Sequence, residues 1–172
     1  MEIGDGMKQV MIVPYDSIWQ HLYIGEQLRL KQVVHSTCNI YHIGSTAIPG
    51  MDARATVDIA LEGHIDCETL ESLGYELICK QAEHTLYATH DHKFHLFVYE
   101  PNNEELQRRL KLRDYFRAYA SERERYSQFK VDLAKVYPFD FSSYKKARDI
   151  FLTVIEEKAM QWDGLHSIKK YG

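Results

Sequence analysis

Short strand-like runs occupy residues 39–99 of this chain, and helix-like periodicity replaces them from residue 102 onward. The runs are rich in β-branched and aromatic residues and are separated by turn-forming residues, as strands are. After Pro101, apolar residues recur every three or four positions, which is typical of amphipathic helices. Strands followed by helices predict an α+β fold. We expect strands at 39–43, 56–61, 76–79, 85–88 and 94–99.

Helices are predicted before, between and after these strands. Asp16 is a candidate N-cap for a first helix that ends near residues 35–37. Residues 66–73 suit a short helix, and Asn102 with Glu105 is a capping signal for the helical half. The last helix should fade near Trp162. The apolar stripes are Trp19, Leu22, Leu30 and Val33, with Glu26 among them; Leu112, Phe116 and Tyr119; Tyr126, Phe129, Leu133 and Val136; and, after Pro138, Tyr144, Ala147, Phe151 and Val154.

A length of 172 residues suits one domain with its own core. We predict a flexible leader over residues 1–9 and a single domain over 10–172. That domain would consist of a sheet core (10–101) and a helical part (102–172). The aromatic residues of the last two stripes are expected in the core.

The net charge of −4 conceals an uneven distribution along the chain. Residues 1–102 carry 6 basic and 14 acidic side chains, whereas residues 103–172 carry 15 and 11. A general nucleic-acid binder usually has an isoelectric point above about 9, and here it is about 6.1. Nucleic-acid binding is therefore not expected, although the C-terminal half can present a local basic face.

The cysteines and the N-terminal residues indicate a reducing compartment. Cys38, Cys67 and Cys79 show no Cys-x-x-Cys spacing, and the chain begins without the apolar segment of a signal peptide. It also lacks the long apolar run that a membrane span needs. We therefore expect a cytoplasmic protein without a membrane span; the oligomeric state stays open.

The stretch His-Ile-Gly-Ser-Thr-Ala-Ile-Pro-Gly, residues 42–50, has the composition of an anion-binding loop. Gly44 lets the backbone approach a ligand closely. Ser45 and Thr46 offer hydroxyl and N–H donors to a phosphate. Asp58 lies in an otherwise apolar strand, where an unpaired carboxylate is costly. Its carboxylate should therefore lie near a cation, a cluster of donors or solvent, and it is a candidate Mg²⁺ ligand facing the anion.

This loop resembles the signature of the GrpB family, in which Lys-Pro and an Asp-containing apolar strand follow. Further stretches resemble family motifs in the same order, so that the resemblance covers roughly residues 10–155. Each motif is short, but their ordered combination is specific. The stretches are Val13–Asp16 with Trp19, Leu112–Arg117, Tyr126–Lys130 and Tyr144–Phe151.

The resemblance implies a nucleotidyltransferase-like core with a mixed β-sheet. In such a core the Gly-Ser motif holds nucleotide phosphates, and strand carboxylates hold Mg²⁺ for displacement at phosphorus. Asp58 and His95 become the candidate catalytic residues, since His95 matches the second histidine of a family His-x-His strand. Some family members are fused to dephospho-CoA kinase, which associates the family with coenzyme A or nucleotide metabolism.

Two positions depart from the expected pattern. Arg54 and Ala55 stand where the family has Lys-Pro, so the charge is kept and the proline is not. Ala60 stands where the wider superfamily has its second metal carboxylate. Glu62, on the same strand face as Asp58, is a candidate substitute.

Several basic residues and histidines are further candidates. Arg113 and Arg117 lie one helical turn apart. They either bind phosphate or form a structural ion-pair network. Glu26 either pairs with a base such as Arg54 or lies at an exposed rim. His42 either contacts ligand or braces the loop. The remaining candidates are Lys130, Lys145 and Arg148, which can line the same cleft, and His84, His90, His92 and His95, which make Zn²⁺ or Mn²⁺ an alternative to Mg²⁺.

These observations predict a protein that binds a nucleotide or another phosphorylated small molecule. If it is an enzyme, nucleotidyl transfer to a small acceptor is the expected reaction. The alternatives are a non-catalytic binding module, which Ala60 favours, and a histidine-based metal-dependent hydrolase. The expected phosphate-binding residues are His42, Gly44, Ser45, Thr46, Arg54, Arg113, Arg117 and Lys130.

Overall fold

The computed structural model describes residues 8–162 of the chain, and the leader predicted at 1–9 lies almost entirely outside that range. Five strands form one mixed sheet in the order β1-β2-β5-β4-β3. β2 and β5 are parallel, and the other neighbouring strands are antiparallel. The predicted α+β class with a mixed sheet is therefore confirmed. The strands are β1 (Asn39–Ile43), β2 (Val57–Glu62), β3 (Tyr75–Lys80), β4 (Thr85–Thr89) and β5 (Phe94–Tyr99).

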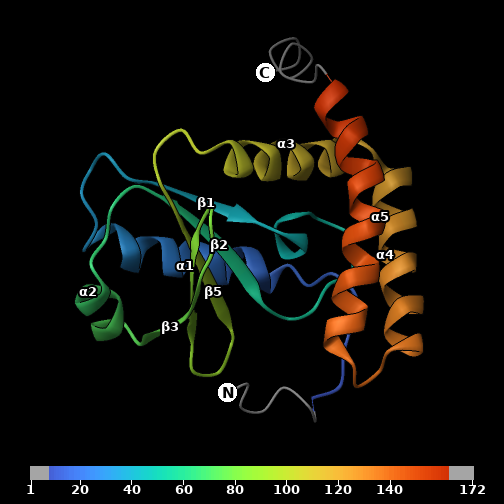
Figure 1. Ribbon diagram of the computed structural model, residues 1–172, viewed down its shortest axis with the longest axis horizontal. Coiled ribbons are helices and arrows are strands. Elements are labelled where there is room, and N and C mark those ends of the chain that lie inside the picture. Colours follow the sequence, from blue (N-terminus) through green and yellow to red (C-terminus); the bar gives the residue numbers. More distant parts are fainter. Residues whose placement is uncertain (1–7, 163–172) are drawn as a thin grey trace.

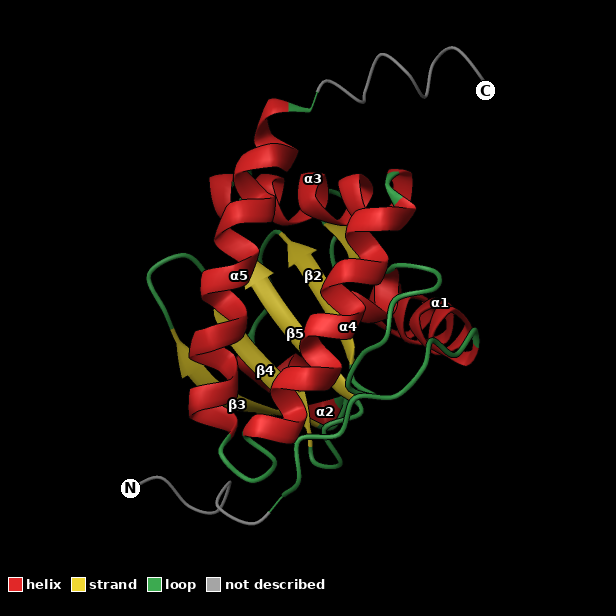
Figure 2. Cartoon of the chain, turned by 90° about the vertical axis from the view of Figure 1, so that its right-hand side faces the viewer, coloured by secondary structure: helices red, strands yellow, loops and turns green. Residues whose placement is uncertain are grey.

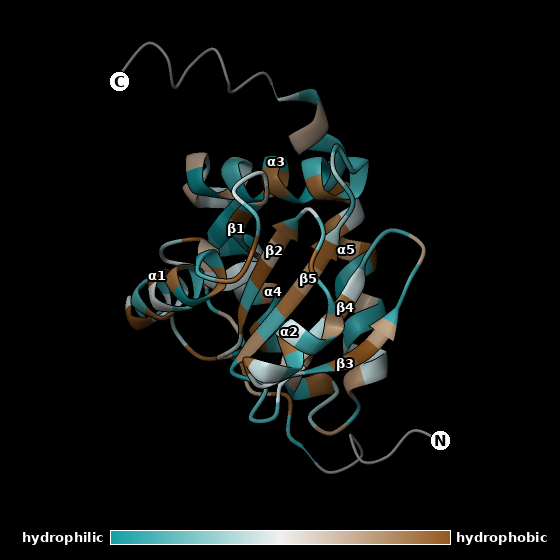
Figure 3. Cartoon of the chain, turned by 90° about the vertical axis from the view of Figure 1, so that its left-hand side faces the viewer, coloured by the Kyte–Doolittle hydropathy of each residue, from teal (hydrophilic) through white to brown (hydrophobic). Residues whose placement is uncertain are grey.

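In the part of the chain that the structure describes, five α-helices cover the two faces of the sheet. Figure 1 shows α3 crossing one end of the strands, with α4 and α5 side by side next to them. In Figure 2, α4 and α5 lie in front of the sheet, and in Figure 3, from the opposite side, α2 lies in front of it, with α1 to one side. Within residues 8–162, no helix is both long and apolar enough for a membrane span. The helices are α1 (Ile18–Lys31), α2 (Cys67–Ser72), α3 (Glu104–Ala118), α4 (Ala120–Val136) and α5 (Phe141–Gln161).

Strand periodicity divides the sheet into an apolar face and a face that carries the candidate site. Residues of β1, β2 and β5 such as Ile40, Ile59 and Leu96 pack against Trp19 and Leu30 of α1. The opposite face carries every second residue of β2 and β5, beginning with Asp58 and His95, which are register partners. The strand alternation therefore turns these polar residues toward the side of α3, α4 and α5.

The helical half is held to the sheet half through the loop after β1. Ile48 and Met51 of this loop are buried against Phe116 of α3 and Tyr126 of α4. Phe129 and Phe151 stack with ring centroids 4.1 Å apart, and the aromatic core predicted for the last two stripes is confirmed. Because the loop is part of this core, its position depends on the helices as well as on the strand before it.

Several sequence predictions about helix ends and faces need correction. Asn103, not Asn102, caps α3, since its side chain accepts a hydrogen bond from the Leu106 N–H at 3.1 Å. Tyr119 is extended and separates α3 from α4. The buried stripe of α1 includes Tyr23, and Val33 lies beyond the helix and is exposed.

Glu26 has a structural role where α1 packs against the sheet. Its carboxylate is 3% exposed and accepts hydrogen bonds from the Tyr75 hydroxyl at 2.8 Å and from Arg29 at 2.8 Å. The partner is therefore not Arg54, and the position is not an exposed rim. A buried carboxylate with a cation and a hydroxyl as donors is a stable arrangement.

Candidate functional site

Gly44 brings the backbone of the loop against the carboxylate of Asp58. Its φ of 73° and ψ of −172° lie in a region that is open essentially to glycine alone. A Cβ at this position would lie 2.5 Å from Asp58 Oδ2. The Gly44 backbone thus lies against Asp58, whereas the close approach predicted from the sequence was to a ligand. After it, Ser45–Ala47 form one turn of 3₁₀ helix.

Asp58 and His95 form a pair at the start of β2 and β5. The distance from His95 Nδ1 to Asp58 Oδ1 is 3.6 Å, and the two side chains are 18% and 29% exposed respectively. Burial raises the pKa of Asp58, although His95 and nearby arginines act in the opposite direction. Burial also lowers the pKa of His95. The two predicted catalytic residues therefore lie together, with the carboxylate open to the adjacent pocket.

Lys130 reaches from α4 to the loop and is 2% exposed. Its ammonium group donates to Ser45 Oγ at 2.8 Å and also to the carbonyl oxygen of Asp52. Burial, together with Arg148 and Arg54, lowers the pKa of Lys130 to about 7. A charged lysine in this position would be an anion-binding group, and a neutral one would be a base.

A small pocket joins these groups. Arg54 enters from the strand-connecting loop, where its guanidinium lies over the Phe141 ring at 4.4 Å, and Arg148 enters from α5. Among the residues that the structure describes, Asp58 is the one carboxylate that lines it, facing three cationic side chains. The lining is Ile12, Ser45, Thr46, Ala53, Arg54, Thr56, Asp58, Lys130, Tyr144 and Arg148.

The structure places Arg113 and Arg117 behind the loop, away from this pocket. Arg113 Nη1 donates to the carbonyl oxygen of His42 at 3.0 Å. Arg117 donates through Nε and Nη2 to the carbonyl oxygen of Ala47, at 3.0 and 2.7 Å. Both also pair with Asp114. The structural interpretation of this arginine pair therefore fits the geometry, because the two guanidinium groups fix both ends of the turn.

His42 also supports the loop from inside. It is 3% exposed, it stacks on the Tyr23 ring at 4.6 Å, and its Nε2 lies 3.0 Å from Thr46 Oγ1. Burial, with Arg117 and Arg113 nearby, lowers the pKa of His42 to about 3. The neutral imidazole thus braces Thr46, and His42 does not line the pocket that Thr46 helps to form.

The four clustered histidines separate in space. His84 lies 3.1 Å from Glu105 of α3, and His90 lies 3.7 Å from Glu76 on the exposed edge strand. Only His92 meets His95, with 3.4 Å between ring nitrogens. Over residues 8–162, no group of three or more His, Cys, Asp or Glu side chains has a metal-binding arrangement.

Glu62 and Ala60 occupy the same strand face as Asp58 but are engaged elsewhere. The Glu62 carboxylate accepts hydrogen bonds from Asn39, Tyr41 and the Asn102 N–H. Ala60 is fully buried in a small apolar cluster with Leu106 of α3. Neither position supplies a second carboxylate to the pocket.

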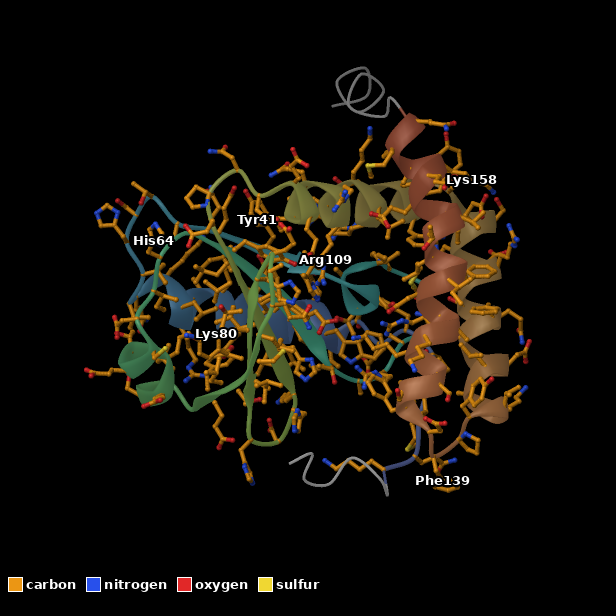
Figure 4. The ribbon with its side chains drawn as sticks, in the orientation of Figure 1. Tyr41, His64, Lys80, Arg109, Phe139 and Lys158 are labelled. Atoms are coloured by element: carbon orange, nitrogen blue, oxygen red, sulfur yellow. The ribbon has the colours of Figure 1, made fainter. Side chains whose placement is uncertain are left out.

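Sequence reasoning did not identify Arg109, Thr56 or Tyr144 as site residues. Thr56 and Tyr144 line the pocket. The Arg109 guanidinium reaches from α3 toward the strands, as Figure 4 shows, and stacks over the Phe97 ring at 4.6 Å. Its charge acts on Asp58. The four-residue spacing of Arg109, Arg113 and Arg117 was a usable signal, since such residues share a helix face.

Comparison with known proteins shows that the sequence is similar to one protein family. The family model described as GrpB protein matches residues 9–158. A UPF0157 protein of Streptomyces coelicolor is 28% identical over 164 residues, which are 91% of this chain and 87% of that protein. UPF0157 protein YqkA of Bacillus subtilis is 29% identical over 167 residues, 90% of this chain and 48% of that protein.

Two solved structures are similar to the fold. The conserved protein GrpB from Enterococcus faecalis superposes with a TM-score of 0.80 at 25% identity, covering 88% of this chain and 98% of that one. The Cid1 poly(U) polymerase bound to MgATP gives a TM-score of 0.48 at 14% identity, covering 72% and 43%. The second likeness is too weak to support an argument.

Proposed function

The chain belongs to the GrpB family, and we propose that its pocket binds the phosphate group of a nucleotide or of another phosphorylated small molecule. One observation carries the proposal: Arg54, Lys130 and Arg148 converge on a single small pocket beside Ser45. They come from a loop and two different helices, so chain proximity does not explain the convergence. The lining holds three basic side chains and one carboxylate, and Asp149, which pairs with Arg148, lies outside it. This balance of charge suits a phosphate.

Asp58 would hold Mg²⁺ beside that phosphate. Mg²⁺ in proteins takes one or two carboxylates and completes its coordination with substrate phosphates and water. The pocket offers one partly exposed carboxylate, which fits if the ligand supplies the remaining oxygens. Bound Mg²⁺ would neutralise phosphate charge during transfer. Because Arg54 and Arg148 act on the same carboxylate, we expect metal binding to require the ligand.

Nucleotidyl transfer to a small acceptor is the reaction that we propose for an active enzyme with this site. A non-catalytic binding module is the second candidate, and the position of Ala60 favours it. A carboxylate there would be buried against Leu106, so the two-metal arrangement is blocked by packing as well as by residue type. The two candidates share the phosphate pocket and differ in their need for metal.

Thermal unfolding with nucleotides, coenzyme A precursors and phosphosugars, each with and without Mg²⁺, tests the proposal. A ligand at a hundred times its Kd should stabilise the protein by about 2.7 kcal/mol. Asp58→Asn should abolish the Mg²⁺-dependent part, and Arg148→Gln should reduce both parts. Asp132→Asn and Arg108→Gln, on exposed helix positions, are the matched controls.

The outcomes separate the candidates. A shift that needs Mg²⁺ and Asp58 supports the metal–phosphate site and justifies transfer assays with the stabilising nucleotide. A shift that is independent of Mg²⁺ and survives Asp58→Asn supports the binding module. If no phosphorylated compound stabilises the wild type, the phosphate pocket is wrong.

A further inference from the structure

Ser45 and Lys130 form a pair whose chemistry phosphate binding alone does not use. The lysine is buried, its nitrogen lies 2.8 Å from the serine oxygen, and both side chains line the pocket. Lysine is rarely buried to this extent. A nucleophile hydrogen-bonded to a base is the arrangement that covalent catalysis requires.

We propose that Ser45 is a nucleophile, that Lys130 is its general base, and that the pair accepts the phosphoryl group of a phosphate ester bound in the pocket. The proposal rests on the phosphate pocket proposed above and adds a covalent step to it. It assigns a chemical role to Lys130 in place of a purely electrostatic one.

The geometry orients the lysine for this role. The carbonyl oxygen of Asp52 accepts a hydrogen bond from the same nitrogen, and the Tyr126 ring lies 4.5 Å from it. A neutral amine can donate to Asp52 while its lone pair accepts the Ser45 hydroxyl proton. Asp52 itself is fixed, since its N–H donates to Ser127 Oγ at 3.0 Å. The amine therefore has little freedom to turn away from Ser45.

Electrostatics supports the neutral amine. The charged groups that act on Lys130 are Arg148 of α5, Asp52 and Arg54 of the connecting loop, and Asp58 of β2. Burial and the two arginines prevail, and the pKa of Lys130 falls to about 7. A lysine with its pKa lowered in this way loses its proton more readily than an exposed one and can then take the serine proton.

The two steps balance with the phosphate ester and water as the reactants. Lys130 takes the Ser45 proton as the oxygen attacks phosphorus, so that the Ser45 O–P bond forms and the ester P–O bond breaks. The leaving oxygen keeps the bonding electron pair and takes its proton from Lys130. Water then attacks the phosphorus, so that a new P–O bond forms and the Ser45 O–P bond breaks. Lys130 takes one proton from the water and returns it to the Ser45 oxygen, which releases orthophosphate. Arg54 and Arg148 would offset the charge on the phosphoryl oxygens.

The test uses p-nitrophenyl phosphate with the full chain. Wild type should release p-nitrophenol in a burst of one equivalent and gain the mass of one phosphoryl group, located at Ser45 by peptide mass spectrometry. Ser45→Ala should show neither signal. Lys130→Arg keeps a cation that can bond to Ser45 and Asp52 but cannot act as a base. It should lower the phosphorylation rate by about 10²–10⁴-fold.

A purely structural role for Lys130 predicts different results from a role as general base. Lys135→Arg makes the same substitution at an exposed position of the same helix, and it should keep the phosphorylation rate near that of wild type. The wild-type rate should rise with pH through about 7 and then level, as Lys130 loses its proton. A slower phosphorylation in Lys130→Arg, with the rate of Lys135→Arg and the stabilisation of Lys130→Arg by orthophosphate both unchanged, would assign the effect to the base.

Two results would overturn the proposal. One is a Lys130→Arg protein that phosphorylates at the wild-type rate, and the other is a wild type without phosphoserine at any pH. Thermal stabilisation by orthophosphate, measured on the same samples, tests the phosphate pocket separately from the covalent step. Stabilisation without phosphoserine removes the covalent step and leaves the phosphate pocket intact.

Discussion

Gly44 combines a backbone conformation reserved for glycine with a close approach to Asp58, the proposed Mg²⁺ ligand. Gly44→Ala should destabilise the protein by about 1–3 kcal/mol from backbone strain alone. Its Cβ would also displace Asp58, which lies 2.5 Å away from that position. We therefore expect Gly44→Ala to abolish the Mg²⁺-dependent ligand stabilisation. Urea unfolding with and without ligand measures both effects.

Gly74 supplies the control for this substitution. Its φ is 88°, and a Cβ there would meet nothing within 4 Å. Gly74→Ala should therefore carry a backbone cost of similar order and leave ligand binding unchanged. Equal ligand responses in the two variants would mean that the approach of Gly44 to Asp58 is not needed for binding.

His42 makes the stability of the fold depend on pH. Its pKa is about 3 in the folded protein and 6.5 when unperturbed. Between these values the unfolded chain binds a proton that the folded chain does not, so stability falls as pH drops below about 6.5. The loss is about 1.4 kcal/mol per pH unit, or about 2 kcal/mol at pH 5.

Replacement of His42 isolates this contribution. His42→Gln should be less stable at pH 7, because Thr46 and Tyr23 lose their partner. Its stability should also change less than that of wild type between pH 6.5 and pH 5. Denaturant unfolding across this range provides the comparison, with the exposed His90→Gln as the control. Parallel pH profiles for His42→Gln and wild type would contradict the assignment.

At the scale of elements, α3 acts as the support for the loop after β1. Arg117 chelates the Ala47 carbonyl through two nitrogens, a geometry that lysine cannot reproduce. Arg117→Lys should therefore raise amide hydrogen exchange of Ser45–Ala47 and cost about 1 kcal/mol of stability, since the guanidinium is partly exposed. Arg108→Lys, on the same helix, should do neither. Unchanged exchange in Arg117→Lys would show that packing alone holds the turn.

The strands and the loop motif were predictable because their signals are local. Alternation and turn residues defined the five strands. The residue types of Gly44, Ser45 and Asp58, together with the resemblance to the GrpB signature, predicted that these three lie together. The helices were harder to interpret in three dimensions. Periodicity shows that Arg113 and Arg117 share a face, but not that this face meets the back of the loop.

The packing of the helices determines which of the remaining candidate residues line the pocket. Lys130 and Arg148 were two of several charged helix residues that could have lined a cleft. They differ from exposed ones such as Lys135 only through the way α4 and α5 cross the loop. Glu26 and Glu62 illustrate the same limit, because burial and hydrogen bonds from distant residues determine their roles.

At the scale of the whole molecule, the pocket lies across the boundary between the sheet half and the helical half. Asp58 and Ser45 come from the first, and Lys130 and Arg148 come from the second. Core residues cross the same boundary, since Ile48 packs among the aromatic residues of the helices. Neither half completes the site alone, so ligand binding should stabilise both halves together.

The two tryptophans allow this to be measured. Trp19 lies in the core between α1 and the sheet, and Trp162 packs on Tyr115 at the end of the helical half. The variants Trp162→Phe and Trp19→Phe each retain one tryptophan, whose fluorescence reports on the unfolding of its own half. We expect each reporter to unfold together with the far-UV circular dichroism signal of its own variant. A stabilising ligand should raise the unfolding midpoints reported by both tryptophans. If the ligand raised only one of them, the two halves would unfold separately and the site would belong to one half.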